Sequence, residues 1–394
     1  MAGSHRCIYR DHQEPPSKWS LEHIWPESLG GDTSPEFFKT SHVCERCNNL
    51  AGLFVDGEFV RSFFTGVELT TAALRFLDTS RPLALPLAFM GVYRAPPPKP
   101  EEICEAWIGP RGERIFYFHK KDRDDFLGFG RGDPIHRTRD HGRVYLAFTK
   151  RNMFWIWTAL LSVRKMFRGA DLRLLAVTDE QAILNLCSAE NEVSKSDRSY
   201  LMPLMDQRTA NLHLSISMDH GVRFQCKLAL GFGHTLFGDT FDGLEYTKNL
   251  RSCLWEMDFQ RRSQFDIRGT PLLSGVRDHD EQLLGIPGAY TFAFFNEPGA
   301  AMSLVYSPST RALRTVIARE PIRLRSPVFD RFSQAFLVVL VPGQSRYLGP
   351  FSILDFTLHR VGGPKISELV ELEETARNID EVERDVARWD IPMS

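Results

Sequence analysis

The feature that most constrains this chain lies between Cys7 and Asn49, where side chains that bind metal ions follow one another in a definite order. A carboxylate directly precedes a histidine at Glu22 and His23, and a Cys-x-x-Cys pair followed by asparagine occupies residues 44–48. Thiolates at this spacing are typical of a structural zinc site, in which the protein fills every coordination position. A catalytic metal site instead has fewer protein ligands, so that water or substrate can also bind the ion. The stretch therefore predicts two metal centres in one small module.

This order and spacing resemble the HNH (ββα-metal) endonucleases, in particular the branch with a Cys-x-x-Cys pair on either side of the catalytic hairpin. The resemblance rests on the Glu-His pair, a Gly-Gly pair at residues 30–31 and the Cys-x-x-Cys-Asn run at residues 44–48, and it covers roughly the first sixty residues. It implies a β-hairpin followed by a helix. It also implies a metal-dependent enzyme that hydrolyses phosphodiester bonds of nucleic acid, with DNA as the expected substrate.

The resemblance assigns a role to each residue of the expected catalytic site. Glu22 is implied as a metal ligand and His23 as the general base, because an imidazole with an ordinary pKa of about 6.5 accepts a proton readily at neutral pH. Asn48 is implied as the second metal ligand, with Asn49 as the alternative. A carboxylate and an amide oxygen are hard ligands, so the expected ion is Mg²⁺ or Mn²⁺.

The structural zinc site departs from the family pattern at its first half. Cys7-Ile8-Tyr9 is followed by Arg10, where the family has a second cysteine, and a guanidinium has no lone pair to donate. Either a histidine completes a Cys₃His site or the zinc is lost. The expected ligands are Cys7, His12, Cys44 and Cys47, with His5 as an alternative to His12.

Other residues are expected to support the loop between the strands. Gly30 and Gly31 allow a tight turn that a side chain would obstruct. The middle asparagine of the family is replaced, and its counterparts are Thr40 or Ser41, whose hydroxyl groups can hydrogen bond to the loop backbone. Asp56 is expected to cap a helix or form a salt bridge.

Composition bounds the class of protein. The 394 residues are 43% hydrophobic and 25% charged, as is typical of folded globular proteins. Seven cysteines with one close pair argue against a disulfide framework. No apolar run reaches the roughly 18 residues of a membrane span, and the N-terminus has no apolar signal segment, so we expect a cytoplasmic protein without membrane contact.

Charge is unevenly distributed along the chain. The net charge is −2, but residues 111–173 hold fifteen Lys or Arg and seven Asp or Glu, a local excess of +8. Such a segment can follow a phosphate backbone, although a solvated surface explains it almost equally well. The expected nucleic-acid contacts there are Lys120, Lys121, Arg137, Arg139, Lys150 and Arg151.

The expected fold class is α+β. We expect a nuclease module at residues 1–65, a helix and proline-rich linker at 66–100, and a larger α+β domain at 101–394. Within the last region, the pattern predicts strands at 143–148, 222–227 and 351–358. It also predicts a helical stretch in two pieces over residues 228–254. This region has no catalytic motif, so we expect it to bind substrate, to regulate, or to contact a protein partner or a second copy of the chain.

Two functional hypotheses follow. The first is an HNH endonuclease; by analogy with other fused nucleases alone, it is expected to act as the effector of an antiviral defence system. The second is a catalytically silent nucleic-acid-binding module of the same fold, which the missing cysteine and the missing middle asparagine favour.

Overall fold

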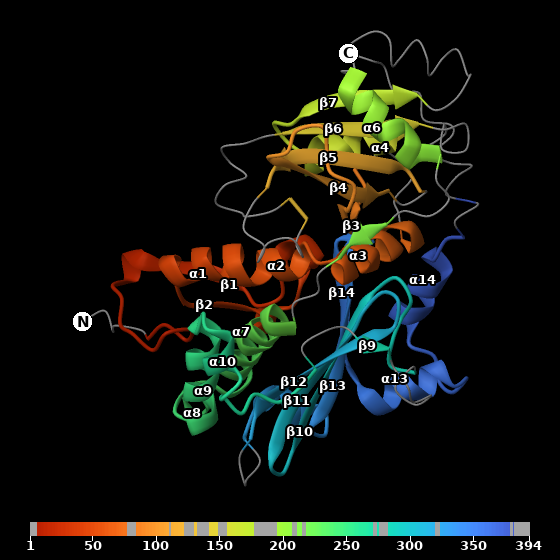
Figure 1. Cartoon of the computed structure of the whole chain (residues 1–394). Helices are drawn as coiled ribbons and strands as arrows, with labels where there is room; N and C mark the ends of the chain where they lie inside the picture. Colours follow the sequence, from red (N-terminus) through yellow and green to blue (C-terminus); the bar gives the residue numbers. More distant parts are fainter. Residues whose placement is uncertain are drawn as a thin grey trace. The chain divides into compact units, whose positions relative to one another are not determined.

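A computed structural model describes residues 6–76, 84–109, 112–121, 130–131, 142–148, 156–176, 195–206, 211–214, 218–270, 274–275, 283–319, 324–378 and 381. The chain forms two compact units (Figure 1). Unit 1 comprises Met1–Val60 with Ser217–Ala376, and unit 2 comprises Arg61–Ile216 with Arg377–Ser394. This division differs from the expected boundaries at residues 65 and 100, because the N-terminal module packs with the C-terminal half of the chain.

The N-terminal part of unit 1 is a hairpin followed by a helix, as expected. Strand β1 (Trp19–His23) pairs antiparallel with β2 (Lys39–Cys44), and α1 (Glu45–Ala51) follows directly. The remaining short helical elements of this part are η1 (Pro16–Lys18), η2 (Glu27–Leu29), η3 (Gly31–Thr33), η4 (Glu36–Phe38), the π-helix η5 (Gly52–Asp56) and α2 (Gly57–Val60).

The C-terminal part of unit 1 supplies a long central helix and a six-stranded sheet. The sheet order is β14-β13-β10-β11-β12-β9. Its strands are β9 (Ser274–Gly275), β10 (Tyr290–Glu297), β11 (Ala300–Tyr306), β12 (Arg311–Ala318), β13 (Ala335–Val341) and β14 (Arg346–Ser352). The helical elements are α7 (Met218–Phe237), α8 (Asp239–Asp242), α9 (Glu245–Trp255), α10 (Phe259–Arg262), α12 (Pro327–Arg331), η9 (Pro342–Gln344), α13 (Ile353–Arg360) and α14 (Ser367–Thr375).

Helix α7 holds unit 1 together, because it contacts β2 and η5 of the N-terminal part and also α9 and β12 of the C-terminal part (Figure 1). An aromatic cluster fills the same space. Trp25, which is fully buried, packs with Phe224 of α7 and with Phe292 of β10 at ring-centroid distances of 5.8 and 4.9 Å. Burial of each such side chain contributes roughly 1.5–3 kcal/mol. The N-terminal module therefore shares its core with residues 199 and 267 positions further along the chain.

Two predicted strands of this region were wrong. Residues 222–227 belong to α7 and form no hairpin. Polar and apolar residues alternate there as in a half-buried strand, but the helix buries both kinds, including Arg223, Gln225 and Lys227. Residues 351–358 end β14 and then form α13, whose N-cap Ser352 accepts a hydrogen bond from the Asp355 amide at 3.4 Å.

Unit 2 contains a second six-stranded sheet, in the order β7-β6-β5-β4-β3-β8. Its strands are β3 (Ala88–Tyr93), β4 (Glu102–Ile108), β5 (Arg114–Lys120), β6 (Arg143–Phe148), β7 (Asp171–Ala176) and β8 (Leu212–His213), and its helices are α3 (Phe63–Arg75), α4 (Ile156–Met166) and α6 (Lys195–Asp206). The strand predicted at 143–148 is confirmed as β6.

The proline-rich segment expected as a linker joins β3 to β4, which are adjacent antiparallel strands of this one sheet. The fold as a whole is α+β, as predicted. No helix in the described parts of the chain has both the length and the apolar character needed to cross a bilayer.

Candidate functional site

The hairpin sets the positions of the Glu-His pair. Glu22 lies opposite Thr40 and His23 lies opposite Lys39 in the antiparallel ladder, with an irregularity between Ser20 and Glu22. Side chains alternate between the two sides of a strand. Accordingly, Glu22 is buried, at 2% exposure, whereas His23 is partly exposed.

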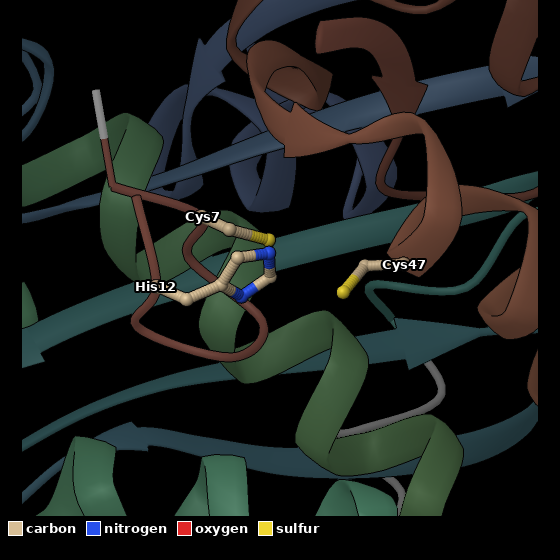
Figure 2. A group of neighbouring side chains, drawn as sticks. All are labelled: Cys7, His12 and Cys47. Carbon is tan, nitrogen blue, oxygen red and sulfur yellow. The ribbon is translucent and has the colours of Figure 1, made fainter. Parts of the chain in front are cut away.

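Three of the predicted zinc ligands converge at the N-terminal end of the module. One ligand atom each from Cys7, His12 and Cys47 lie within 4.8 Å of one another, and the three side chains point toward a common centre (Figure 2). Cys44 completes the set, since its Sγ lies 3.5 Å from His12 Nε2. Three thiols and one imidazole are a donor set that zinc takes up in structural sites.

Local backbone contacts place these ligands. The Cys7 amide donates to the His12 carbonyl at 2.9 Å, and the Cys7 carbonyl accepts from the Asp11 amide at 2.7 Å, so residues 7–12 form a closed turn. Cys44 is the N-cap of α1, and its Sγ accepts from the Cys47 amide at 3.4 Å. A hydrogen bond from the Cys47 thiol lowers the pKa of Cys7 to about 5, which favours the thiolate that a metal requires.

The missing fourth cysteine has a structural explanation. The guanidinium of Arg10 lies over the Trp255 ring, 4.4 Å from its centroid, and takes no part in the thiol cluster. His12 fills the fourth place instead, and its Nε2 also lies 3.3 Å from Glu14 Oε1. The alternative ligand His5 lies outside the described residues.

Glu22 has partners that the sequence did not indicate. Its Oε1 accepts a hydrogen bond from the Tyr9 hydroxyl at 2.9 Å and lies 2.8 Å from Lys227 Nζ of α7. Burial, first of all, and the Glu22 charge raise the pKa of Tyr9, so the phenol stays protonated and donates.

Lys227 is fully buried, and its ammonium group is surrounded by oxygen atoms. Besides Glu22, its Nζ contacts Asp56 Oδ2 at 2.6 Å and donates to the carbonyls of His23 and Ile24 at 3.1 and 3.3 Å. Removing a charge from water costs several kcal/mol unless it is well paired, and these contacts supply the pairing. Asp56 is thus a salt-bridge residue, as predicted.

Asp56 also retains a buried oxygen, Oδ1, that has no hydrogen-bond partner among the described residues. Burial raises the pKa of Asp56 to about 7, against the opposing effect of Lys227.

His23 is oriented by a carboxylate. Its Nδ1 lies 2.9 Å from Glu27 Oε1, four residues further along the chain. A proton on Nδ1 that is held by Glu27 leaves Nε2 as the basic nitrogen. The contact with Glu27 therefore fixes the orientation of the imidazole.

Asn48 is anchored on β1 through one end of its amide. Its Nδ2 donates to the Leu21 carbonyl at 2.9 Å and to Ser20 Oγ at 3.1 Å, so Oδ1 is the end that can bind a metal. Asn49 is exposed. The Lys227 and Tyr9 contacts of Glu22 both involve Oε1, and carboxylate and amide oxygens are the kinds of donor that a hard divalent ion prefers.

The loop residues have clear steric roles. Gly30 has φ +94°, a left-handed conformation that glycine adopts without strain. A Cβ at Gly31 would lie 1.9 Å from the Trp25 carbonyl oxygen. Thr40 Oγ1 accepts from the His42 amide at 3.1 Å, whereas Ser41 is exposed.

The expected nucleic-acid contacts are only partly described. Lys120 ends β5 and is exposed, and the Lys121 amide donates to the Glu101 carbonyl at 2.9 Å; both residues belong to unit 2. Arg137, Arg139, Lys150 and Arg151 lie outside the described residues.

Sequence reasoning missed Tyr9, Glu27 and Lys227. The Glu27 spacing of four residues from His23 was visible but gave no specific signal, because the two residues lie on different local elements. Nothing in the surrounding sequence marks Lys227, because Arg223 and Gln225 of the same helix are also polar and also buried.

Comparison with known families gives an independent result. Residues 7–64 match the sequence model of a family described as HNH endonuclease. No curated protein and no solved structure matches the chain. The matched range contains the hairpin, α1, the thiol cluster and the Glu-His pair, and HNH nuclease domains act on nucleic acid. The N-terminal module of this protein is therefore an HNH endonuclease domain.

Proposed function

We propose that this protein is a metal-dependent endonuclease that hydrolyses phosphodiester bonds of DNA. The contact of His23 Nδ1 with Glu27 at 2.9 Å is the main support, because it gives the imidazole of an HNH domain the tautomer of a general base. In this proposal, Nε2 of His23 removes a proton from the attacking water.

The chain's own residues prepare the rest of the site. Glu22 and Asn48 would hold Mg²⁺ or Mn²⁺, and the ion would supply positive charge for the phosphate oxygens. Tyr9 and Lys227 hold the Glu22 carboxylate in place. Lys227 also bonds to the carbonyl of His23, so one side chain of α7 supports both members of the Glu-His pair.

The test is plasmid nicking by His23→Ala beside the wild-type protein, with Mg²⁺ or Mn²⁺ added. We expect the rate to fall about 10²- to 10⁴-fold, which is the usual contribution of a general base. His213→Ala is the matched control, because His213 is an exposed histidine of unit 2. Undiminished nicking by His23→Ala, with an unchanged circular dichroism spectrum, would refute the assignment.

A catalytically silent nucleic-acid-binding module is the second candidate. The contact of Lys227 with Glu22 favours it, because an ammonium group already neutralises the carboxylate that a catalytic ion would need. This candidate predicts salt-dependent DNA binding and no turnover with either ion. A protein partner, a homodimer through the C-terminal part and a role in defence stay predictions.

A further inference from the structure

Three arginine side chains surround a cavity in unit 1 that the nuclease motif does not include. The cavity has a volume of about 570 Å³ and lies along β11, β12 and the segment before β9. Arg268, Arg314 and Arg319 all line it. We refer to these three residues, with Asp266, as the arginine pocket.

The backbone around this pocket is firmly held. The Thr270 amide donates to the Arg314 carbonyl at 2.9 Å, and the Arg314 amide donates to Thr270 Oγ1 at 2.9 Å. Gln225 of α7, which is 2% exposed, donates through Nε2 to the carbonyls of Thr270 and Arg314 at 2.7 and 2.6 Å. Gly269 has φ +138°, and a Cβ there would lie 2.2 Å from the Arg314 carbonyl oxygen. The pocket is thus built on a fixed frame.

The charges of the pocket do not cancel. Asp266 contacts Arg268 Nε through Oδ1 at 2.5 Å and Arg319 Nη1 through Oδ2. One carboxylate therefore positions two guanidinium groups, and the four side chains carry a net charge of +2. The side chains of Arg268 and Arg319 are 61% and 43% exposed, so their remaining N–H groups can reach a ligand.

The floor of the pocket is apolar. Met302 and Val316 lie opposite each other in the β11–β12 ladder, and both line the cavity. Nη2 of Arg314 lies 3.6 Å from Met302 Sδ, so this guanidinium borders the floor. A charged rim above an apolar floor suits a ligand with an anionic end and a flat apolar part.

We propose that the arginine pocket binds the phosphate group of a nucleotide, with the sugar or base lying over Met302 and Val316. Guanidinium groups present paired N–H donors that match phosphate oxygens, and such charge-assisted bonds are among the strongest hydrogen bonds in proteins. The phosphate can belong to a free nucleotide or to a nucleic-acid strand. The proposal does not depend on the nuclease chemistry, because it concerns binding alone.

The experiment measures binding by the full-length protein in EDTA, so that no cleavage occurs. Fluorescence anisotropy follows a short fluorescein-labelled single-stranded DNA, and calorimetry follows adenosine monophosphate and inorganic phosphate. We expect Arg314→Met, Arg268→Met and Arg319→Met each to weaken DNA binding by about 10-fold or more. Each should also lower the slope of log affinity against log salt by about 1.

Controls separate this pocket from other basic surfaces. Arg331→Met removes an exposed arginine of α12 that lies over Phe332, and its affinity should match that of the wild type. Arg314→Lys keeps the charge but loses the paired donors, so it should bind DNA more weakly than the wild type and more tightly than Arg314→Met. Thermal unfolding of every variant verifies that the fold is intact.

The outcomes decide both the proposal and the source of the phosphate. Binding of adenosine monophosphate that the Arg→Met variants lose indicates a nucleotide site, and loss of DNA binding alone indicates a strand site. If the folded Arg→Met variants bind every ligand as the wild type does, while Lys120→Ala with Lys121→Ala weakens DNA binding, the proposal is overturned. His23→Ala should bind normally, so failure of the nuclease proposal leaves this test unaffected.

Discussion

The two centres of the nuclease module are built in different ways. The thiol cluster draws all its candidate ligands from residues 7–47, through a closed turn and the first turn of α1. The Glu22 carboxylate, by contrast, lies in a network completed by Lys227, about 200 residues away in the chain. One centre is local and the other is tertiary.

This difference explains which parts of the site the motif could predict. All four candidate zinc ligands lie within the motif, so its spacing could predict them, although Arg251 and Trp255 of α9 also hold the Cys7 turn by donating to the carbonyls of Ile8 and Tyr9. A buried carboxylate needs a partner, and the partner can come from any element that packs against it. The thiol cluster can thus follow the general pattern of the motif, while the surroundings of Glu22 are specific to this chain.

The largest expected effect concerns the local centre. Cys47→Ser should remove bound zinc and lower the free energy of unfolding by roughly 5 kcal/mol, less than the ~10–16 kcal/mol of zinc-finger peptides because the aromatic core remains. Metal analysis and urea unfolding measure both effects. Cys104→Ser is the control, since Cys104 is a buried thiol of unit 2, and it should retain zinc. Zinc retained by Cys47→Ser would contradict the assignment of Cys47 as a ligand.

The tertiary centre gives the next largest effect. Lys227→Met should lower the free energy of unfolding by about 3–5 kcal/mol, because it leaves Glu22 and Asp56 without their buried counter-charge. Lys248→Met is the control: Lys248 forms an exposed pair with Glu245, worth about 1 kcal/mol or less. Zinc content of Lys227→Met should stay normal. A Lys227→Met protein that lost zinc as well would show that the two centres are not independent.

Two glycines of the N-terminal module differ in the space around them, and their alanine variants test that difference. Gly31→Ala should destabilise by about 1–3 kcal/mol, because its Cβ would overlap the Trp25 carbonyl. Gly52→Ala should stabilise by about 0.5–1 kcal/mol, since Gly52 is helical and has nothing within 4 Å of a Cβ. Thermal unfolding of the pair measures the difference. Equal changes in melting temperature would mean that the backbone around Gly31 can move aside to accommodate the added Cβ.

The last expected effect concerns the nicking rate and acts through His23. Glu27→Gln keeps a hydrogen-bonding group beside Nδ1 but removes the carboxylate that orients the imidazole. We expect the nicking rate to fall by about 10-fold, roughly 1.4 kcal/mol in the barrier, with no change in zinc content. Glu36→Gln is the control, because Glu36 is 95% exposed. A Glu27→Gln enzyme as fast as the wild type would remove Glu27 from the mechanism.

The fold class and the hairpin-helix module were predictable because they depend on local order. Strand β6 was predicted at its observed residues, since residues 144–148 form a short continuous apolar run with a valine and two aromatic residues. The strand predicted at 222–227 was wrong for a physical reason: polar and apolar residues alternate there as in a strand, but α7 buries both kinds, so no exposed polar face marks the helix. The sequence likewise did not indicate the arginine pocket. Arg268 and Arg314 are separated by 46 positions, and backbone hydrogen bonds between residues 268–270 and β12 bring them together.

The motif between residues 7 and 49 was sufficient to predict the thiol cluster, the hairpin with its glycine loop and the order of the Glu-His pair, because all their residues lie within it. The contact of an α7 lysine with Glu22, and the core that the N-terminal module shares with the C-terminal sheet, arise only in the folded chain. The reason is that counter-charges and packing partners are chosen by proximity in space, which no local pattern encodes.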